Sequence, residues 1–137
     1  MADITQIWLI AATSDDKNSD SNSHLELQVA MDGVVAELKT SDDTSKYGSK
    51  DNTGDCAQWT WTSDFWDGDL QTGPTASDFD LEILANNAWL PVSVWVTTLD
   101  SDGNYAMPVS IPNWPTADVL STDSSEGKSS YNLGDVS

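Results

Sequence analysis

The stretch Trp89–Val96 reads Trp-Leu-Pro-Val-Ser-Val-Trp-Val, and its pattern decides the fold class. Apolar residues, most of them β-branched, recur at every second position, as in a strand with one buried face. The other face contains two tryptophans and Pro91. Because proline has no N–H to donate, Pro91 predicts a bulge or an unpaired neighbour. The predicted core face consists of Leu90, Val92, Val94 and Val96.

Short strand patterns recur along the rest of the chain, separated by turn residues at the spacing of a sandwich. Asp32-Gly33 is a hairpin signal, and Pro108 and Pro112 restrict the strand at 105–111 to an edge or an end. No stretch has a convincing helical pattern. The sequence therefore predicts an all-β fold, an antiparallel β-sandwich of about eight strands in two sheets. The predicted strands are 4–12, 24–32, 34–40, 56–66, 78–84, 89–96 and 105–111, with 116–122 as a further candidate.

The predicted sandwich domain covers residues 1–122. From 123 to 137 the chain is rich in Ser, Gly and Asp, which predicts a flexible polar tail. Large aromatic residues at alternating positions of the predicted strands are expected to fill the core. These predicted core aromatics are Trp8, Trp59 and Trp61, and Phe65 is expected on the same face as Trp59 and Trp61.

The chain is strongly acidic, with 23 Asp and Glu against 5 Lys and Arg and a formal net charge of −18. A nucleic acid is not an expected partner, because binding one needs a basic surface. Three interpretations of the acidity remain open. The charge can keep the surface soluble by self-repulsion, it can be an adaptation to high salt, or it can bind divalent cations through hard oxygen ligands.

Cys56 is the only cysteine of the chain, so an intrachain disulfide is excluded. The first residues carry no basic segment and no long apolar run, and we therefore predict neither a secretory signal nor a transmembrane helix. The sequence fits a soluble protein and equally a module cut from a larger one, and it does not specify a compartment.

Several motifs occur in an order that resembles PLAT domains, also called lipoxygenase-homology or LH2 domains. A strand followed by Thr13-Ser14-Asp15-Asp16-Lys17 and a polar loop into Leu25-Glu26-Leu27 is similar to the opening of that family. Ile83, Asn86-Asn87 and Trp89, followed by alternating valines, are similar to its middle segment. The stretch 107–114, ending Ile-Pro-Asn-Trp, is similar to its closing strand, and the resemblance covers roughly residues 4–120.

The resemblance implies a sandwich of two four-stranded sheets that binds lipid or protein partners, often with calcium in the loops at one end. It implies calcium ligands in the first polar loop and in the following Asn-Asn turn. Two positions that hold Asp in the family are amides here, and amides still ligate calcium through oxygen. The calcium ligands implied in this chain are Asp15, Asp16, Asp20, Asn22, Asn86 and Asn87.

Three tryptophans, Trp66, Trp89 and Trp114, lie at the ends of predicted strands beside turns. Tryptophan at one pole of a sandwich can insert into a lipid headgroup layer, so these residues are candidates for partner binding. Our first hypothesis is therefore that the chain is a non-enzymatic, calcium-assisted module that engages membrane lipid or a protein partner through loops at one end of the sandwich. One alternative is a carbohydrate-binding module that uses exposed tryptophans. The other is an acidic structural or assembly protein without a ligand.

Residues suited to catalysis are few. His24 is the only histidine, no arginine is present, and no nucleophile motif surrounds Cys56. The acidic residues could supply a carboxylate pair for glycoside hydrolysis, but no pair is singled out by spacing. The turn at 100–104, Asp-Ser-Asp-Gly-Asn, offers hard oxygens but lacks the later Glu of an EF-hand. We therefore expect no enzymatic activity.

Overall fold

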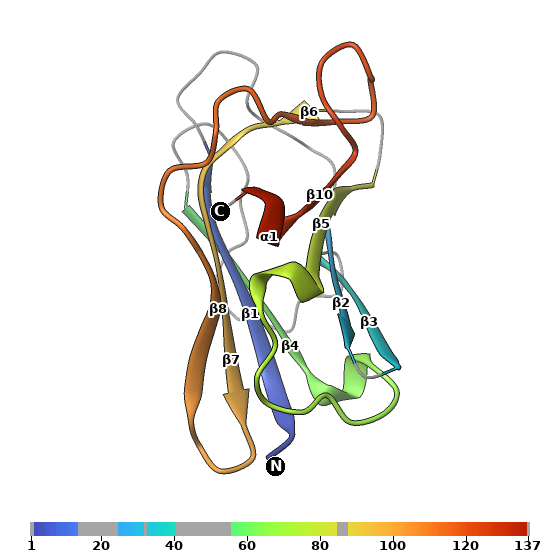
Figure 1. The fold of residues 1–137 in the computed structure, drawn as a ribbon, viewed down its shortest axis with the longest axis vertical. Helices are drawn as coiled ribbons and strands as arrows, with labels where there is room; N and C mark the ends of the chain where they lie inside the picture. Colours follow the sequence, from blue (N-terminus) through green and yellow to red (C-terminus); the bar gives the residue numbers. More distant parts are fainter. Residues whose placement is uncertain (1, 14–24, 32, 41–55, 85–87, 137) are drawn as a thin grey trace.

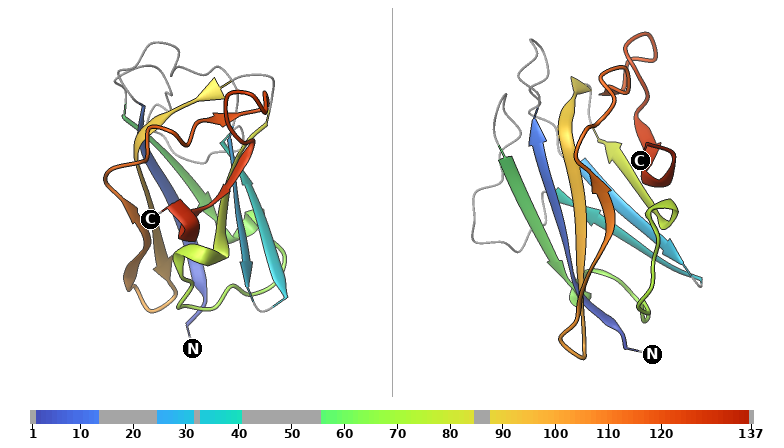
Figure 2. Two further views of the ribbon diagram at one scale, coloured as in Figure 1. Left: turned by 45° about the horizontal axis from the view of Figure 1, so that its top comes forward. Right: turned by 60° about the vertical axis from the view of Figure 1, so that its left-hand side comes forward.

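The computed structural model of the chain describes residues 2–13, 25–31, 33–40, 56–84 and 88–136. Within these residues, strands form two four-stranded antiparallel sheets that face each other, which confirms the predicted β-sandwich (Figures 1 and 2). The first sheet has the order β4-β1-β7-β8 and consists of β4 (Cys56–Thr62), β1 (Ile4–Thr13), β7 (Pro91–Asp100) and β8 (Tyr105–Ile111). The second sheet has the order β10-β5-β2-β3 and consists of β10 (Ser130–Asn132), β5 (Phe79–Ile83), β2 (Leu25–Met31) and β3 (Val34–Lys39).

Short elements complete the described chain. A small antiparallel pair lies across one end of the sandwich (Figure 1). No helix of the described residues is long and apolar enough to span a membrane. The short elements are β6 (Ala88–Trp89), β9 (Leu120–Ser121), η2 (Ser63–Phe65), η3 (Ala76–Asp78) and α1 (Leu133–Val136).

The core lies between the two sheets, where alternate side chains of each strand point inward. In the first sheet, Leu9 of β1 is paired with Trp59 of β4 and Val96 of β7. Trp61 is completely buried, and its indole Nε1 donates a hydrogen bond of 2.8 Å to the backbone oxygen of Lys39. Since Trp61 belongs to β4 and Lys39 to β3, this contact ties an edge of one sheet to an edge of the other.

The strand predicted from Trp89–Val96 is divided into β6 and β7, and its alternation changes phase. Val94 and Val96 are fully buried as predicted, but the Val92 side chain is 48% exposed, so its assignment to the core was wrong. The reason lies in the pairing with β1, where Ala12 faces Ser93 and Thr13 faces Pro91. This irregularity displaces Val92 to the outer side and confirms the bulge predicted from Pro91.

Two local predictions are confirmed by strand pairing. Met31 pairs with Val34 across the predicted hairpin, and Gly33 has φ +80°, which favours glycine in such a tight turn. Strand β8 lies at an edge of its sheet, as its prolines require. The prediction that Phe65 shares a face with Trp59 and Trp61 was wrong, because the chain leaves the strand after Thr62 and the Phe65 ring is exposed on η2.

The prediction of a loose tail after residue 122 was also wrong. Strand β10 pairs with β5, with Tyr131 opposite Leu81, and so forms an edge of the second sheet. Leu133 at the start of α1 is fully buried in the common core. The composition of the segment is polar, but a three-residue strand and one apolar anchor suffice to place it.

Candidate binding surfaces

The six implied calcium ligands, Asp15, Asp16, Asp20, Asn22, Asn86 and Asn87, lie outside the described residues. The described residues that flank them can still be located. Thr13 is opposite Pro91 in the first sheet, and Leu25 is opposite Ile83 in the second. The ends of β1 and β5 and the starts of β2 and β7 lie at the same end of the sandwich, which we call the loop pole (Figure 1).

The three tryptophans proposed for partner binding are buried. The exposed fraction is 8% for Trp66, 1% for Trp89 and 4% for Trp114. The prediction that these residues are exposed aromatics available to a partner was therefore wrong, because their rings belong to the core cluster.

Long-range packing explains why these rings are buried. Trp89 in β6 pairs with the fully buried Leu120 of β9. The indole Nε1 of Trp114 donates a hydrogen bond of 2.7 Å to the backbone oxygen of Asp118, and its ring meets Tyr131 edge to face at 5.9 Å between centroids. Residues in and around β9 and β10 thus cover Trp89 and Trp114, and the position of these two residues at strand ends does not reveal this contact.

The outer side of the first sheet offers different aromatic residues. Trp8 lies between the fully buried Ile7 and Leu9, and Trp95 lies between the fully buried Val94 and Val96, so both indoles point outward and are partly exposed. Tyr105 is 68% exposed, and its ring lies 5.8 Å from the Trp8 ring, tilted by 35°. The prediction that placed Trp8 in the core was wrong.

The strands of this sheet carry almost no charge, and we call the outer side of the sheet the neutral face. Its four strands, all of them within the described residues, contain one charged residue, Asp100, at the end of β7. Neutral amide and hydroxyl side chains flank the aromatic rings instead. The strand register gives two neighbouring rows across the sheet, Gln58–Ile10–Trp95–Ser110 and Thr60–Trp8–Thr97.

The outer side of the second sheet carries the opposite chemistry. Glu26 of β2 lies opposite Lys39 of β3 on one side and Glu82 of β5 on the other, and Glu37 and Asp80 are close by in the same strands. Burial, followed by the charges of Glu37 and Glu82, raises the pKa of Glu26 above 4.5. The sandwich therefore has one acidic face and one neutral face.

Because the folded state holds the Glu26 proton more tightly than the unfolded chain, ionised Glu26 lowers stability as the pH rises above about 4.5. We expect Glu26→Gln to raise the melting temperature at pH 7 in low salt and to have little effect at pH 3, well below the ordinary pKa of a glutamate, where the Glu26 carboxyl is protonated in both states. Thermal melts at both pH values measure the difference. Glu126→Gln, which removes the same charge from an exposed turn, is the control, and an equal gain in both variants would contradict the prediction.

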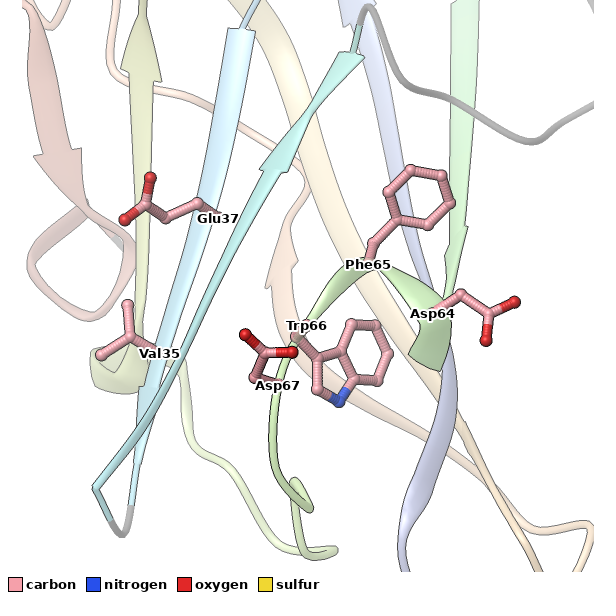
Figure 3. A pocket seen from close by; sticks show the side chains of 6 residues that line it. All are labelled: Val35, Glu37, Asp64, Phe65, Trp66 and Asp67. Carbon is pink, nitrogen blue, oxygen red and sulfur yellow. The ribbon is translucent and has the colours of Figure 1, made fainter.

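A depression of about 360 Å³ lies beside η2 and β3, where an edge of each sheet approaches the other. Figure 3 shows that its carboxylates point in different directions and do not converge on a common point. Among the described residues, no group of three His, Cys, Asp or Glu side chains is placed to hold a metal ion. The residues that line the depression are Val35, Glu37, Asp64, Phe65, Trp66 and Asp67.

No protein-family model matches this chain, and no curated protein matches it.

The turn at residues 100–104 uses its first carboxylate internally. Asp100 Oδ1 accepts hydrogen bonds of 2.9 Å from the backbone N–H groups of both Asp102 and Asn104. This is the hydrogen bonding of a hairpin turn, with Gly103 at φ +84°. Cys56 is exposed at the start of β4, and His24 lies outside the described residues.

The neutral face is the surface that the sequence interpretation missed. A signal for it existed, because the stretches that form β1, β4 and β8 contain no charged residue in a chain with a net charge of −18. Alternation alone identifies two faces of a strand, but it does not say which of two apolar faces is covered.

Proposed function

We propose that the chain is a non-enzymatic binding module of the PLAT type, in which calcium at the loop pole assists binding to membrane lipid or a protein partner. The observation that carries this proposal is the position of the strand ends that flank the two candidate ligand segments. Thr13 and Leu25 flank the first segment, and Ile83 and Ala88 lie close to the ends of the second. The ends of β1 and β5 and the starts of β2 and β6 lie at the loop pole (Figure 1).

The strands that flank the first candidate segment are hydrogen-bonded to strands that flank the second. The pair Thr13–Pro91 and the pair Leu25–Ile83 each join a strand next to the first segment with a strand next to the second. The strands that flank the two candidate segments thus meet at one end of the fold, which supports a calcium site with ligands from both segments. Strand β3 ends and strand β4 begins at this pole (Figure 1), and the sequence between these two strands contains four further Asp residues.

Charge gives calcium a role in partner binding. A net charge of −18 repels anionic lipid headgroups and acidic proteins. Calcium would neutralise carboxylates at the pole and lower that repulsion. Since Trp66, Trp89 and Trp114 are buried, the partner contact in this proposal is made by the pole loops and not by these rings. The lack of arginine and the single histidine support a role without catalysis.

A thermal melt tests the calcium step. A ligand that binds only the native state at 100 times its Kd stabilises it by about 2.7 kcal/mol, which for a domain of this size is a rise on the order of 10 °C in Tm. We expect calcium, added after EDTA, to raise the Tm, and magnesium at the same concentration to raise it less. Co-sedimentation with phosphatidylserine-containing vesicles, with and without calcium, then tests lipid as the partner.

A matched pair of variants separates a site from general charge screening. Asp15→Asn/Asp16→Asn removes two carboxylates from the candidate segment, and Asp67→Asn/Asp69→Asn removes two exposed carboxylates from the opposite end of the sandwich (Figure 1). We expect the first variant to lose most of the calcium-dependent shift and the second to keep it. The proposal is wrong if calcium does not change the Tm, or if both variants lose the shift equally.

A further inference from the structure

The neutral face needs an explanation because its surroundings are so acidic. The strands of the second sheet contain four acidic residues, Glu26, Glu37, Asp80 and Glu82, whereas the strands of the first sheet contain one, Asp100. Exposed aromatic surface without charge lowers solubility, and on a soluble protein it marks a binding surface more often than a random patch does. Tyr105 and Met107 are exposed here by more than half of their surface.

The chemistry of the face selects the class of ligand. A cationic ligand would be drawn to the acidic face first, because the strands of the neutral face hold a single carboxylate, Asp100, at the end of β7. A purely apolar partner would bury Gln58, Thr97 and Ser110 without hydrogen bonds, which is costly. The fitting ligand therefore has apolar patches to cover aromatic rings and neutral polar groups to meet amides and hydroxyls.

A neutral glycan has both properties. The C–H groups on one side of a sugar ring carry slight positive charge and pack on the negative face of an aromatic ring. The sugar hydroxyls donate and accept hydrogen bonds, as the amide of Gln58 and the hydroxyls of Thr97 and Ser110 do. The outer side of a four-stranded sheet spans about 15 Å across three strand spacings, so it offers more length than a single sugar ring needs and suits an extended chain of sugars.

We propose that the neutral face binds a neutral oligosaccharide or polysaccharide, with Trp8, Trp95 and Tyr105 as the stacking residues and with Gln58 and Ser110 as hydrogen-bonding residues at the two ends of the Trp95 row. The centroids of the Trp8 and Tyr105 rings are 5.8 Å apart, so the two rings form a single aromatic surface. Trp95 lies one row away, diagonal to Trp8 across the pairing of β1 with β7. This proposal is independent of calcium at the loop pole.

Native gel electrophoresis with glycans in the gel tests the proposal. The probes are hydroxyethylcellulose, mixed-linkage β-glucan, laminarin and dextran, all neutral, so that slower migration reports binding and not charge. The gels contain EDTA, which separates this result from any outcome of the calcium experiment. We expect at least one probe to retard the protein, and Trp95→Ala to weaken retardation about tenfold, the usual effect of removing an aromatic anchor.

Two further variants keep the test decisive. Tyr105→Ala removes an exposed ring and is not expected to disturb folding, so it replaces Trp95→Ala if the latter does not fold. Phe65→Ala removes an exposed aromatic ring from η2, outside the face, and should bind as the unmodified chain does. Absence of retardation by all four glycans overturns the proposal, as does equal weakening by Phe65→Ala. A dimer that Tyr105→Ala abolishes, without glycan binding, assigns the face to a second copy instead.

Discussion

Trp61→Ala is expected to lower the free energy of unfolding by about 3–5 kcal/mol, the usual cost of truncating a buried tryptophan. The indole is fully buried and donates its N–H to the backbone oxygen of Lys39 at 2.8 Å. The variant therefore loses core packing and also one contact between β4 and β3, which belong to different sheets. Trp61→Phe retains most of the packing. Its free energy of unfolding should fall by about 1 kcal/mol for the lost hydrogen bond, and by a further amount for the contacts that the smaller ring no longer makes.

Urea unfolding followed by circular dichroism measures these changes without relying on tryptophan emission. Trp8→Ala is the matched control, because it makes the same substitution on the outer side of the same sheet. We expect the loss at Trp8 to be less than half of that at Trp61. Equal losses would mean that Trp61 does not join the two sheets in the way described.

The second large effect is expected at the C-terminal end. Leu133→Ala should lower the free energy of unfolding by about 2–4 kcal/mol, since Leu133 is fully buried. Its neighbours leave little room for adjustment. Asn132 Nδ2 donates to the backbone oxygen of Ser77 at 2.9 Å, and a Cβ on Gly134 would lie 2.8 Å from the Ser77 Cα. The backbone around Leu133 is thus held against η3.

Leu84→Ala is the control for this prediction, because the Leu84 side chain is 39% exposed and the chemical change is identical. Urea unfolding should give a much smaller loss at Leu84. A comparable loss in the two variants would support the flexible tail expected from composition and contradict the packing of β10 and α1 against the sandwich.

Much of the fold follows from local pattern. The alternation of apolar and polar residues in β5 and β2 predicts their buried faces correctly. In each of these strands a single face is apolar, so the pattern of that strand alone decides which side is buried. The hairpin at Gly33 was likewise predictable, since only local geometry decides it. The exposed Val92 was not, because its phase depends on how Pro91 pairs with the distant Thr13.

The candidate surfaces were harder to predict for a related reason. Whether a tryptophan binds a partner depends on what covers it, and for Trp114 the covering residues include Tyr131, in a segment whose composition predicts no structure. Trp8 shows the converse case. Its neighbours Ile7 and Leu9 are apolar too, so the sequence offers two possible inward faces, and the packing of the second sheet selects the one without Trp8.

The division between an acidic and a neutral face makes repulsion between copies of this molecule depend on direction. Two molecules that approach with Glu26, Glu37 and Glu82 forward repel each other, whereas two that approach with Trp95 forward meet little opposing charge. Dissolved salt shortens the range of the repulsion, to about 8 Å at physiological ionic strength, but leaves an uncharged surface unchanged. At high salt, where the repulsion between acidic faces is screened, the neutral face is therefore the side that decides how copies of the protein attract one another.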